Sequence, residues 1–341
     1  MTIAAPIANS LQRASWIRQM FETGAQLKQQ YGADQVFDFS LGNPILEPPP
    51  KVHETLHTLL DDPAPGHHRY MPNGGFAVVR EYLANELKEE QELPFLAADV
   101  VLCVGAGGGL NVVAKALLEP GDEVVALAPY FVEYGFYVQN HGGVLTVAKT
   151  RQEDFLPDLD ALEAVMTPKT RAIIVNSPNN PTGVVYSQEV LDELGTWLHT
   201  QEQRFGRPIY LIADEPYRKL LFDEATNGSV LKAHPNSILI TSHSKDLGLA
   251  GERIGYIALH PEVPDRALWQ EALVFTNRIL GFVNAPALMQ RALPHLRGVQ
   301  VDIDFYQQLR DQVCGLMEEV GISCVRPQGA FSLFPQAPEE D

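Results

Sequence analysis

The chain has 341 residues, of which 45% are hydrophobic and 20% are charged, and its formal net charge is −18. This length allows one large hydrophobic core and a smaller second one, and the composition is typical of a globular protein. The acidic balance argues against a nucleic-acid partner, which would require a basic face.

Cysteine usage and the N-terminal sequence indicate the compartment. Cys103, Cys314 and Cys324 are an odd number without close pairing, which favours free thiols in a reducing environment. No His/Cys cluster has metal-ligand spacing, so we expect no metal site. The sequence shows neither a signal-peptide pattern nor an apolar run of membrane-spanning length, and we therefore expect a cytoplasmic protein.

The first predicted element is a helix over residues 10–30, whose apolar side chains recur at helical spacing and which Gly32 would end. A short strand-like run, FDFSL (37–41), follows it, and a proline-rich stretch extends from Asn43 to Pro50. We interpret these segments as an N-terminal arm and an extended linker.

From residue 100 onward, short β-rich runs alternate with amphipathic helical stretches such as 187–204. The β-rich runs cover residues 100–104, 123–128, 172–176, 209–214, 238–242 and 254–259. Near-continuous apolar strands separated by helices predict a mostly parallel sheet that is covered on both faces. Another amphipathic helix is predicted over 304–321, and a strand-like FSLF follows at 331–334. In such sheets, ligands bind where the carboxyl ends of strands lead into helices.

A glycine run follows the first of these strands. It extends from Gly105 to Gly109, and we expect a helix to open from Leu110. Glycines let the backbone approach a ligand closely, and a helix N-terminus offers free N–H groups to an anion, so the run suits a phosphate. A plain tight turn is the alternative, because neither the P-loop nor the dinucleotide-binding pattern is present.

Polar residues also end two later strands. The segment from Asn176 to Gly183 (NSPNNPTG) brings asparagine amides to a strand end, although a turn-rich loop has the same composition. Asp214 closes the apolar strand IYLIA, where a carboxylate is costly unless a cation, such as a protonated pyridine nitrogen, pairs with it. Alternatively, Asp214 caps the next helix.

Lys245 lies in the loop SHSKDLGLAGER (242–253), between two predicted strands. A lysine in a loop is usually a solvated charge, but small polar and glycine residues flank this one at the predicted ligand edge. A desolvated lysine has a lowered pKa and is nucleophilic toward an aldehyde. A lysine, a carboxylate, hydrogen-bond donors and a phosphate site are together what pyridoxal 5'-phosphate (PLP) chemistry requires.

Over residues 37–334, the chain resembles the fold-type I PLP-dependent enzymes, specifically class I/II aminotransferases of the aspartate aminotransferase type. The resemblance rests on Asn-Pro-Thr-Gly, Asp-Glu-Pro-Tyr and Ser-His-Ser-Lys, in that order. It implies an α/β three-layer sandwich with a mostly parallel seven-stranded sheet, plus a smaller α+β domain that is incomplete at the C-terminus. The domains would be an arm with part of the small domain (1–45), a large PLP-binding domain (46–275) and a truncated small domain (276–341).

The resemblance also implies roles for individual residues. Lys245 would form the Schiff base with PLP and act as the acid–base catalyst, and Asp214 would pair with the ring nitrogen. The remaining cofactor ligands would be Ser242, Arg253, Ala106 and Gly107 at the phosphate, Tyr217 and Asn180 at the phenolic oxygen, and Phe131 stacked on the ring. Phe131 could instead be an ordinary core residue.

Two further matches imply a homodimer with shared active sites. Tyr70 would reach the phosphate bound by the neighbouring subunit, although it could also be an ordinary surface tyrosine. Gly42 would lie beside the substrate.

The implied reaction is transamination between an amino acid and a 2-oxo acid, whose identities the sequence leaves open. Alternatives are another PLP reaction, such as a carbon–sulfur β-lyase, or a chain that binds PLP without turnover. The last alternative arises because family members carry, beyond the motif at 327–331, an arginine that binds the substrate α-carboxylate, and no residue here matches it. Arg278 lies close to the position of an arginine that binds a second carboxylate in aspartate-specific relatives.

Overall fold

A computed structural model describes residues 3–37 and 44–337 of the chain. The chain divides into two compact units, Met1–Ile45 and Leu46–Asp341. Within the described ranges, no helix has both the length and the apolar character needed to cross a membrane.

The first unit contains one long helix, α1 (Ala5–Tyr31), and a short 3-10 turn, η1 (Ala33–Gln35). The helix ends at Gly32, whose N–H donates to the Lys28 carbonyl at 3.0 Å. The predicted helix and its glycine stop are therefore confirmed. The predicted strand at 37–41 lies outside the described residues except for its first position.

The second unit alternates strands with helices. Its strands are β1 (Val100–Val104), β2 (Glu123–Ala128), β3 (Val144–Lys149), β4 (Thr170–Val175), β5 (Tyr210–Asp214), β6 (Ser237–Ser242) and β7 (Ile254–Leu259). Its helices are α2 (Pro50–Asp61), α3 (Ala77–Gln91), α4 (Gly105–Leu117), α5 (Glu133–Asn140), α6 (Leu159–Val165), α7 (Gln188–Phe205), α8 (Val230–Ala233), α9 (Arg266–Ile279), α10 (Ala287–Ala292) and α11 (Ile303–Glu319). Short 3-10 turns are η2 (Ala97–Asp99), η3 (Ala250–Glu252) and η4 (Leu293–His295).

The seven strands form one sheet in the order β1-β7-β6-β5-β4-β2-β3. Neighbouring strands from β6 to β3 are parallel, whereas β7 runs antiparallel to both β6 and β1. The predicted mostly parallel, seven-stranded sheet is confirmed. Strand β3 was not among the predicted strands. It lies at the edge of the sheet, where Val144 is 49% exposed and Val147 is 40% exposed, and it lacks a continuous apolar sequence.

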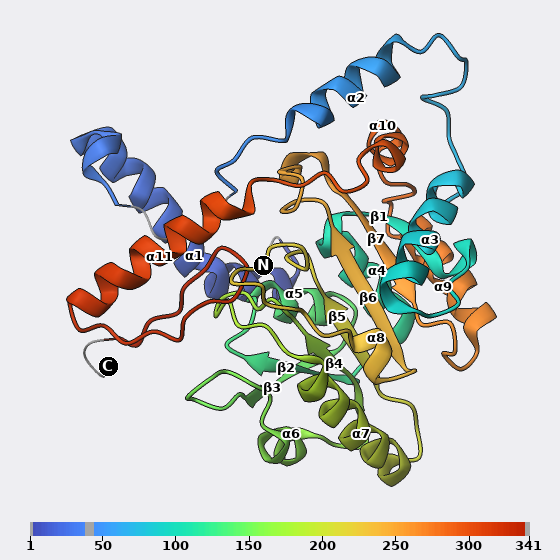
Figure 1. Ribbon diagram of the computed structural model, residues 1–341. Coiled ribbons are helices and arrows are strands. Elements are labelled where there is room, and N and C mark those ends of the chain that lie inside the picture. The colour runs from blue at the N-terminus through green and yellow to red at the C-terminus, as the bar shows by residue number, and fades with distance from the viewer. Residues whose placement is uncertain (1–2, 38–43, 338–341) are drawn as a thin grey trace. The chain divides into compact units, whose positions relative to one another are not determined.

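Alternate side chains of each strand enter two separate cores, which makes the unit a three-layer sandwich (Figure 1). In β1, Val101 and Cys103 belong to a core shared with α4, α5 and α9. Val100 and Leu102 face the opposite core, which α3, α6, α7 and α10 complete. Burial on both faces explains why the central strands are almost uniformly apolar.

The glycine run after β1 is helical, so the predicted helix start at Leu110 is wrong. The helix α4 already begins at Gly105. The glycines let it pack closely on the sheet, because a Cβ added at Gly109 would lie 2.7 Å from Cγ2 of Ile240. Apolar periodicity cannot detect a helical turn made of glycine, and the first side chain that reveals the helix is Leu110.

The strand predicted at 331–334 is also wrong. The chain around this segment forms isolated bridges, such as Cys324 with Pro335, instead of a strand. Pro335 has no N–H with which to extend a ladder. Phe331 packs its ring against Tyr306, with the centroids 4.4 Å apart.

Close packing of α7 on α8 yields a first prediction. A Cβ at Gly195 would overlap the Ala233 carbonyl oxygen, whereas a Cβ at Gly315 on α11 would meet nothing within 4 Å. We expect Gly195→Ala to lower the free energy of unfolding by about 1–3 kcal/mol through overpacking. The matched control, Gly315→Ala, should raise it by about 0.5–1 kcal/mol. Urea denaturation measures both, and equal effects would contradict the close approach.

Candidate active site

Lys245 lies in the loop that connects β6 to β7. Its Nζ atom is 5.6 Å from the ring centroid of Tyr217 and 5.6 Å from that of Phe331. Burial lowers the pKa of this lysine, and the positive charge of Arg253 lowers it further. A lowered pKa increases the share of neutral amine, which is the nucleophilic form.

The predicted phosphate residues meet at the N-terminus of α4. A Cβ at Gly105 would lie 2.6 Å from Nη2 of Arg253, so the guanidinium approaches bare backbone there. A Cβ at Gly107 would lie 3.0 Å from the Tyr137 hydroxyl, and Ala106 lies between the two glycines. The first N–H groups of a helix have no partner within the helix, so this corner attracts an anion.

Ser242, the last residue of β6, borders the same corner. A Cβ added at Gly255 would lie 3.1 Å from Cβ of Ser242 and 3.2 Å from the carbonyl carbon of Gly105. The Ser242 hydroxyl donates to the Ser244 hydroxyl at 3.2 Å. The structure therefore brings a hydroxyl, a guanidinium and a helix N-terminus together, which is the donor set that a phosphate monoester requires.

Asp214 ends β5 with a carboxylate that is only half satisfied. Its side chain is buried, and Oδ2 accepts a 2.6 Å hydrogen bond from the Tyr134 hydroxyl, while Oδ1 is buried without a partner. Burial raises the pKa of Asp214 to about 6, and the Tyr134 hydrogen bond opposes this rise. The unpaired oxygen fits a protonated ring nitrogen. The alternative role as a helix cap is wrong, because the next helix, α8, is capped by Ser229.

Asn176 joins the ends of β4 and β5. Its Nδ2 donates to the Asp214 backbone carbonyl at 2.6 Å, and its Oδ1 accepts from the Asn180 N–H at 2.6 Å. This buried side chain therefore fixes the backbone of two predicted cofactor residues. The loop after it is braced by Asn179, whose Oδ1 accepts from the N–H and the hydroxyl of Thr182.

Two edge-to-face aromatic pairs line the site. Phe131 packs against Tyr134 with ring centroids 5.6 Å apart and planes at 85°. Tyr217 packs against Phe331 at 5.6 Å and 87°. Phe131 therefore adjoins Asp214 through Tyr134, and Tyr217 adjoins Lys245.

The remaining predicted residues do not join this cluster within the described chain. Tyr70 is 93% exposed. Gly42 lies outside the described residues.

The sequence did not assign roles to several side chains that shape the site, notably Tyr134, Tyr137 and Asn176. Tyr134 lies in the first turn of α5, and Phe131 precedes the helix, so helical spacing does not predict that their rings meet. Asn176 was recognised as a polar residue at a strand end, but its partner was not predicted, because its amide hydrogen-bonds to Asp214, 38 residues away.

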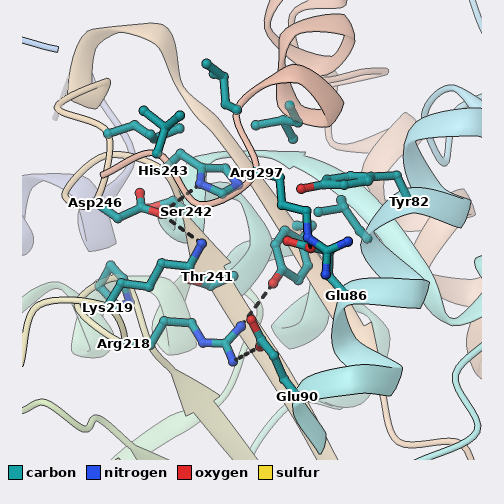
Figure 2. A pocket seen from close by; sticks show the side chains of 17 residues that line it. Tyr82, Glu86, Glu90, Arg218, Lys219, Thr241, Ser242, His243, Asp246 and Arg297 are labelled. Atoms are coloured by element: carbon teal, nitrogen blue, oxygen red, sulfur yellow. Dashed lines mark hydrogen bonds and ion pairs between the residues drawn. The ribbon is translucent and has the colours of Figure 1, made fainter. Parts of the chain in front are cut away.

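A charged pocket adjoins the Lys245 loop, which contributes His243 and Asp246 to its lining. Figure 2 shows Lys219 and His243 converging on the buried carboxylate of Asp246, at 3.7 and 3.0 Å. The backbone carbonyl of Asp246 accepts from the Val301 N–H at 2.8 Å. The residue next to Lys245 is therefore tied to the loop after β5 and to the segment that precedes α11.

Arg218 forms the second part of this pocket. It donates to Glu90 on α3 at 2.6 Å (Figure 2). It also donates to the Tyr256 hydroxyl at 3.2 Å. Glu215, the neighbour of Asp214, lies 3.7 Å from the same guanidinium, and burial raises its pKa to about 7. These ion pairs anchor the loop after β5, which carries Tyr217.

Comparison with known sequences shows what the chain is similar to. The family model described as Aminotransferase class I and II matches residues 34–341. An aspartate aminotransferase from Geobacillus stearothermophilus is 31% identical over 309 residues, which are 89% of this chain and 76% of that protein. The aspartate/prephenate aminotransferase of Thermus thermophilus is 31% identical over 322 residues, or 92% of this chain and 80% of that protein.

Solved structures are similar as well. The crystal structure of an amino transferase from Eubacterium rectale has a TM-score of 0.96 at 36% identity and covers 100% of this chain and 86% of that one. Aspartate aminotransferase from Thermus thermophilus with maleate has a TM-score of 0.79 at 28% identity, and the match covers 92% and 80% of the two chains.

The buried Asp214 yields a prediction for the cofactor-free protein. Its folded-state pKa of about 6 lies above the ordinary 3.8, so folding takes up a proton and stability falls as pH rises between these values. The destabilisation should be absent near pH 4 and reach about 3 kcal/mol above pH 6. Asp214→Asn should remove this contribution, so in urea denaturation the variant should gain stability relative to the parent as the pH rises from about 4 to about 6, and keep that gain at higher pH. Parallel pH profiles of the two proteins would refute the assignment.

Proposed function

Because the chain belongs to the aminotransferase class I and II family, whose members depend on PLP, we propose that it transfers the amino group of a dicarboxylic amino acid to a 2-oxo acid, with Lys245 as the catalytic residue. One observation carries this proposal. A buried carboxylate with an unpaired oxygen ends β5, and a desolvated lysine amine follows the end of the adjacent strand β6.

Lys245 is the residue that acts on the substrate. Bound PLP supplies an aldehyde that a lysine can hold covalently and a protonated ring that accepts the electrons left when a Cα–H bond breaks. With PLP bound, the Lys245 amine would hold its aldehyde carbon and would serve as the base that takes the proton from the substrate Cα. Its lowered pKa suits this role, because only the neutral amine accepts a proton.

The corner formed by Ser242, Arg253 and the N-terminus of α4 would hold the phosphate of PLP. Arg253 offers a guanidinium that is already fixed, because Nη1 donates to the Ala250 carbonyl at 2.8 Å. Ala106 and Gly107 contribute backbone N–H groups.

Asp214, Phe131, Tyr217 and Asn180 hold the ring. The unpaired Oδ1 of Asp214 would pair with the ring nitrogen and keep it protonated. Phe131 would stack on the ring. The Tyr217 hydroxyl and the Asn180 amide would donate to the phenolic oxygen. Burial together with the Asp214 charge raises the pKa of Tyr217, so its hydroxyl stays a donor.

Names of relatives support a dicarboxylic substrate. Two similar proteins are called aspartate aminotransferase and aspartate/prephenate aminotransferase, and one similar structure was solved with maleate, a dicarboxylate. In this chain, Arg278 is exposed at the end of α9, with its guanidinium carbon 5.2 Å from the Phe275 ring centroid. We assign Arg278 to the second carboxylate of the substrate.

We further propose a homodimer with shared sites. A tyrosine that is 93% exposed, Tyr70, is available to a neighbouring subunit, where it would donate to the phosphate. Within each subunit, residues 46–275 form the large PLP-binding domain and residues 276–341 belong to the small one. Three free cysteines support a reducing compartment, the cytoplasm.

Replacing the lysine tests the reaction. We expect Lys245→Met to reduce amino transfer from aspartate to 2-oxoglutarate by at least about 10³-fold, because the variant lacks the covalent anchor and the proton acceptor. The exposed Lys232→Met on α8 is the matched control and should leave the rate unchanged. The wild-type chain should react faster with aspartate than with alanine. Equal rates for Lys245→Met and the control would contradict the proposal.

Hybrid dimers test the shared site. Lys245→Met and Tyr70→Ala each damage every site of their own homodimer. If Tyr70 acts across the subunit boundary, unfolding and refolding the two variants together creates hybrids in which one site has both residues intact. Activity should then exceed that of either variant alone, and the mass in solution should be twice the 37.7 kDa of one chain. Failure of the mixture to gain activity would show that Tyr70 acts within its own chain or not at all.

A further inference from the structure

Tyr134 makes the hydrogen bond that determines how Asp214 is presented. The side chain is 1% exposed, and its hydroxyl donates to Oδ2 of Asp214 at 2.6 Å. A hydroxyl directed at one carboxylate oxygen fixes the torsion of the carboxylate. The second oxygen, Oδ1, is then left without a partner in this buried site.

The position of that hydroxyl is itself fixed by the start of α5. The Tyr134 N–H donates to the Phe131 carbonyl at 3.1 Å, and the two rings pack edge to face at 5.6 Å. On its other side, the Tyr134 ring stacks on Tyr130 with centroids 6.4 Å apart and planes at 13°. One tyrosine therefore sets the spacing between the carboxylate and the aromatic residue Phe131.

We propose that Tyr134 is a positioning residue, which keeps Asp214 ionised and turned with Oδ1 toward the cofactor ring nitrogen, in register with Phe131. This inference rests on the proposed function, because it requires that PLP binds between Phe131 and Asp214. Tyr134 does not touch the reacting atoms and acts through Asp214.

Charge balance around Asp214 makes this hydrogen bond necessary. The titratable groups that face it are Tyr134 and Tyr137 on α5 and Glu215 and Tyr217 beyond β5. None of these four is a cation at neutral pH, and burial favours the neutral acid. The Tyr134 hydroxyl therefore opposes protonation of Asp214 until a protonated ring nitrogen arrives.

Tyr134→Phe tests the inference, because it keeps the ring and removes the hydroxyl. We expect the dissociation constant of PLP, measured by absorbance titration at pH 7.5, to increase about tenfold through loss of one charge-assisted hydrogen bond. As the pH is lowered, PLP affinity should also begin to fall at a higher pH in the variant than in the parent, because Asp214 protonates more readily without the hydrogen bond. The KM for aspartate should change little, while kcat falls.

Tyr186→Phe is the matched control. Tyr186 is also 1% exposed, but it belongs to the core on the opposite face of the sheet, and its hydroxyl donates to the Phe155 carbonyl at 3.3 Å. This variant should bind PLP like the parent. In an Asp214→Asn background, adding Tyr134→Phe should change PLP affinity by less than about twofold, since the group through which it acts is gone.

The outcomes separate the two proposals. A parent chain that fails to bind PLP overturns the proposed function itself. A parent that binds PLP, together with a folded Tyr134→Phe variant of the same affinity and pH profile, overturns only the positioning role. An undiminished tenfold loss in the Asp214→Asn background would also overturn it, because the effect would then bypass Asp214.

Discussion

The site depends on a carboxylate that the fold buries and only half satisfies. Asp214 stands at the end of the central strand β5, where Asn176 holds its backbone and Tyr134 holds one of its oxygens. The other oxygen has no partner, so the buried charge lowers the free energy of unfolding as long as no cation pairs with it. A cationic ligand that paired with this oxygen would therefore stabilise the folded protein, because it would remove the free-energy cost of the unpaired buried charge.

Sheet topology explains how residues far apart in sequence become neighbours of that carboxylate. The parallel strands β4, β5 and β6 end at one edge, so Asn176, Asp214 and Ser242 emerge side by side. The glycines at the start of α4 then let a guanidinium lie against the helix terminus, where a side chain would exclude it. Ion pairs behind this edge, centred on Asp246 and Arg218, hold the two loops that carry Lys245 and Tyr217.

Much of this could be predicted from the sequence, and the exceptions have physical causes. The sheet, and with it the positions of Lys245 and Asp214, followed from uniformly apolar strands that end in polar residues. The edge strand β3 was not predicted because its side chains are partly exposed and its sequence is therefore not uniformly apolar. The first turn of α4 was not predicted because glycine has no side chain that could show helical periodicity. Tyr134 could not be paired with Asp214, since 80 residues separate them and only the folded sheet brings them to hydrogen-bonding distance.

The antiparallel direction of β7 determines which loop carries Lys245 and Arg253. If β7 were parallel to β6, the chain would need a crossover connection back to the end of the sheet at which β6 begins. Because β7 runs the other way, the chain turns back at once, and Ser242 pairs with Gly255 across the mouth of the turn. The single loop formed by residues 243–253 therefore carries both Lys245 and Arg253, and strand pairing between β6 and β7 fixes its two ends. Because residues 243–253 carry both Lys245 and Arg253, an insertion or deletion in this loop would change the distance between the lysine amine and the guanidinium.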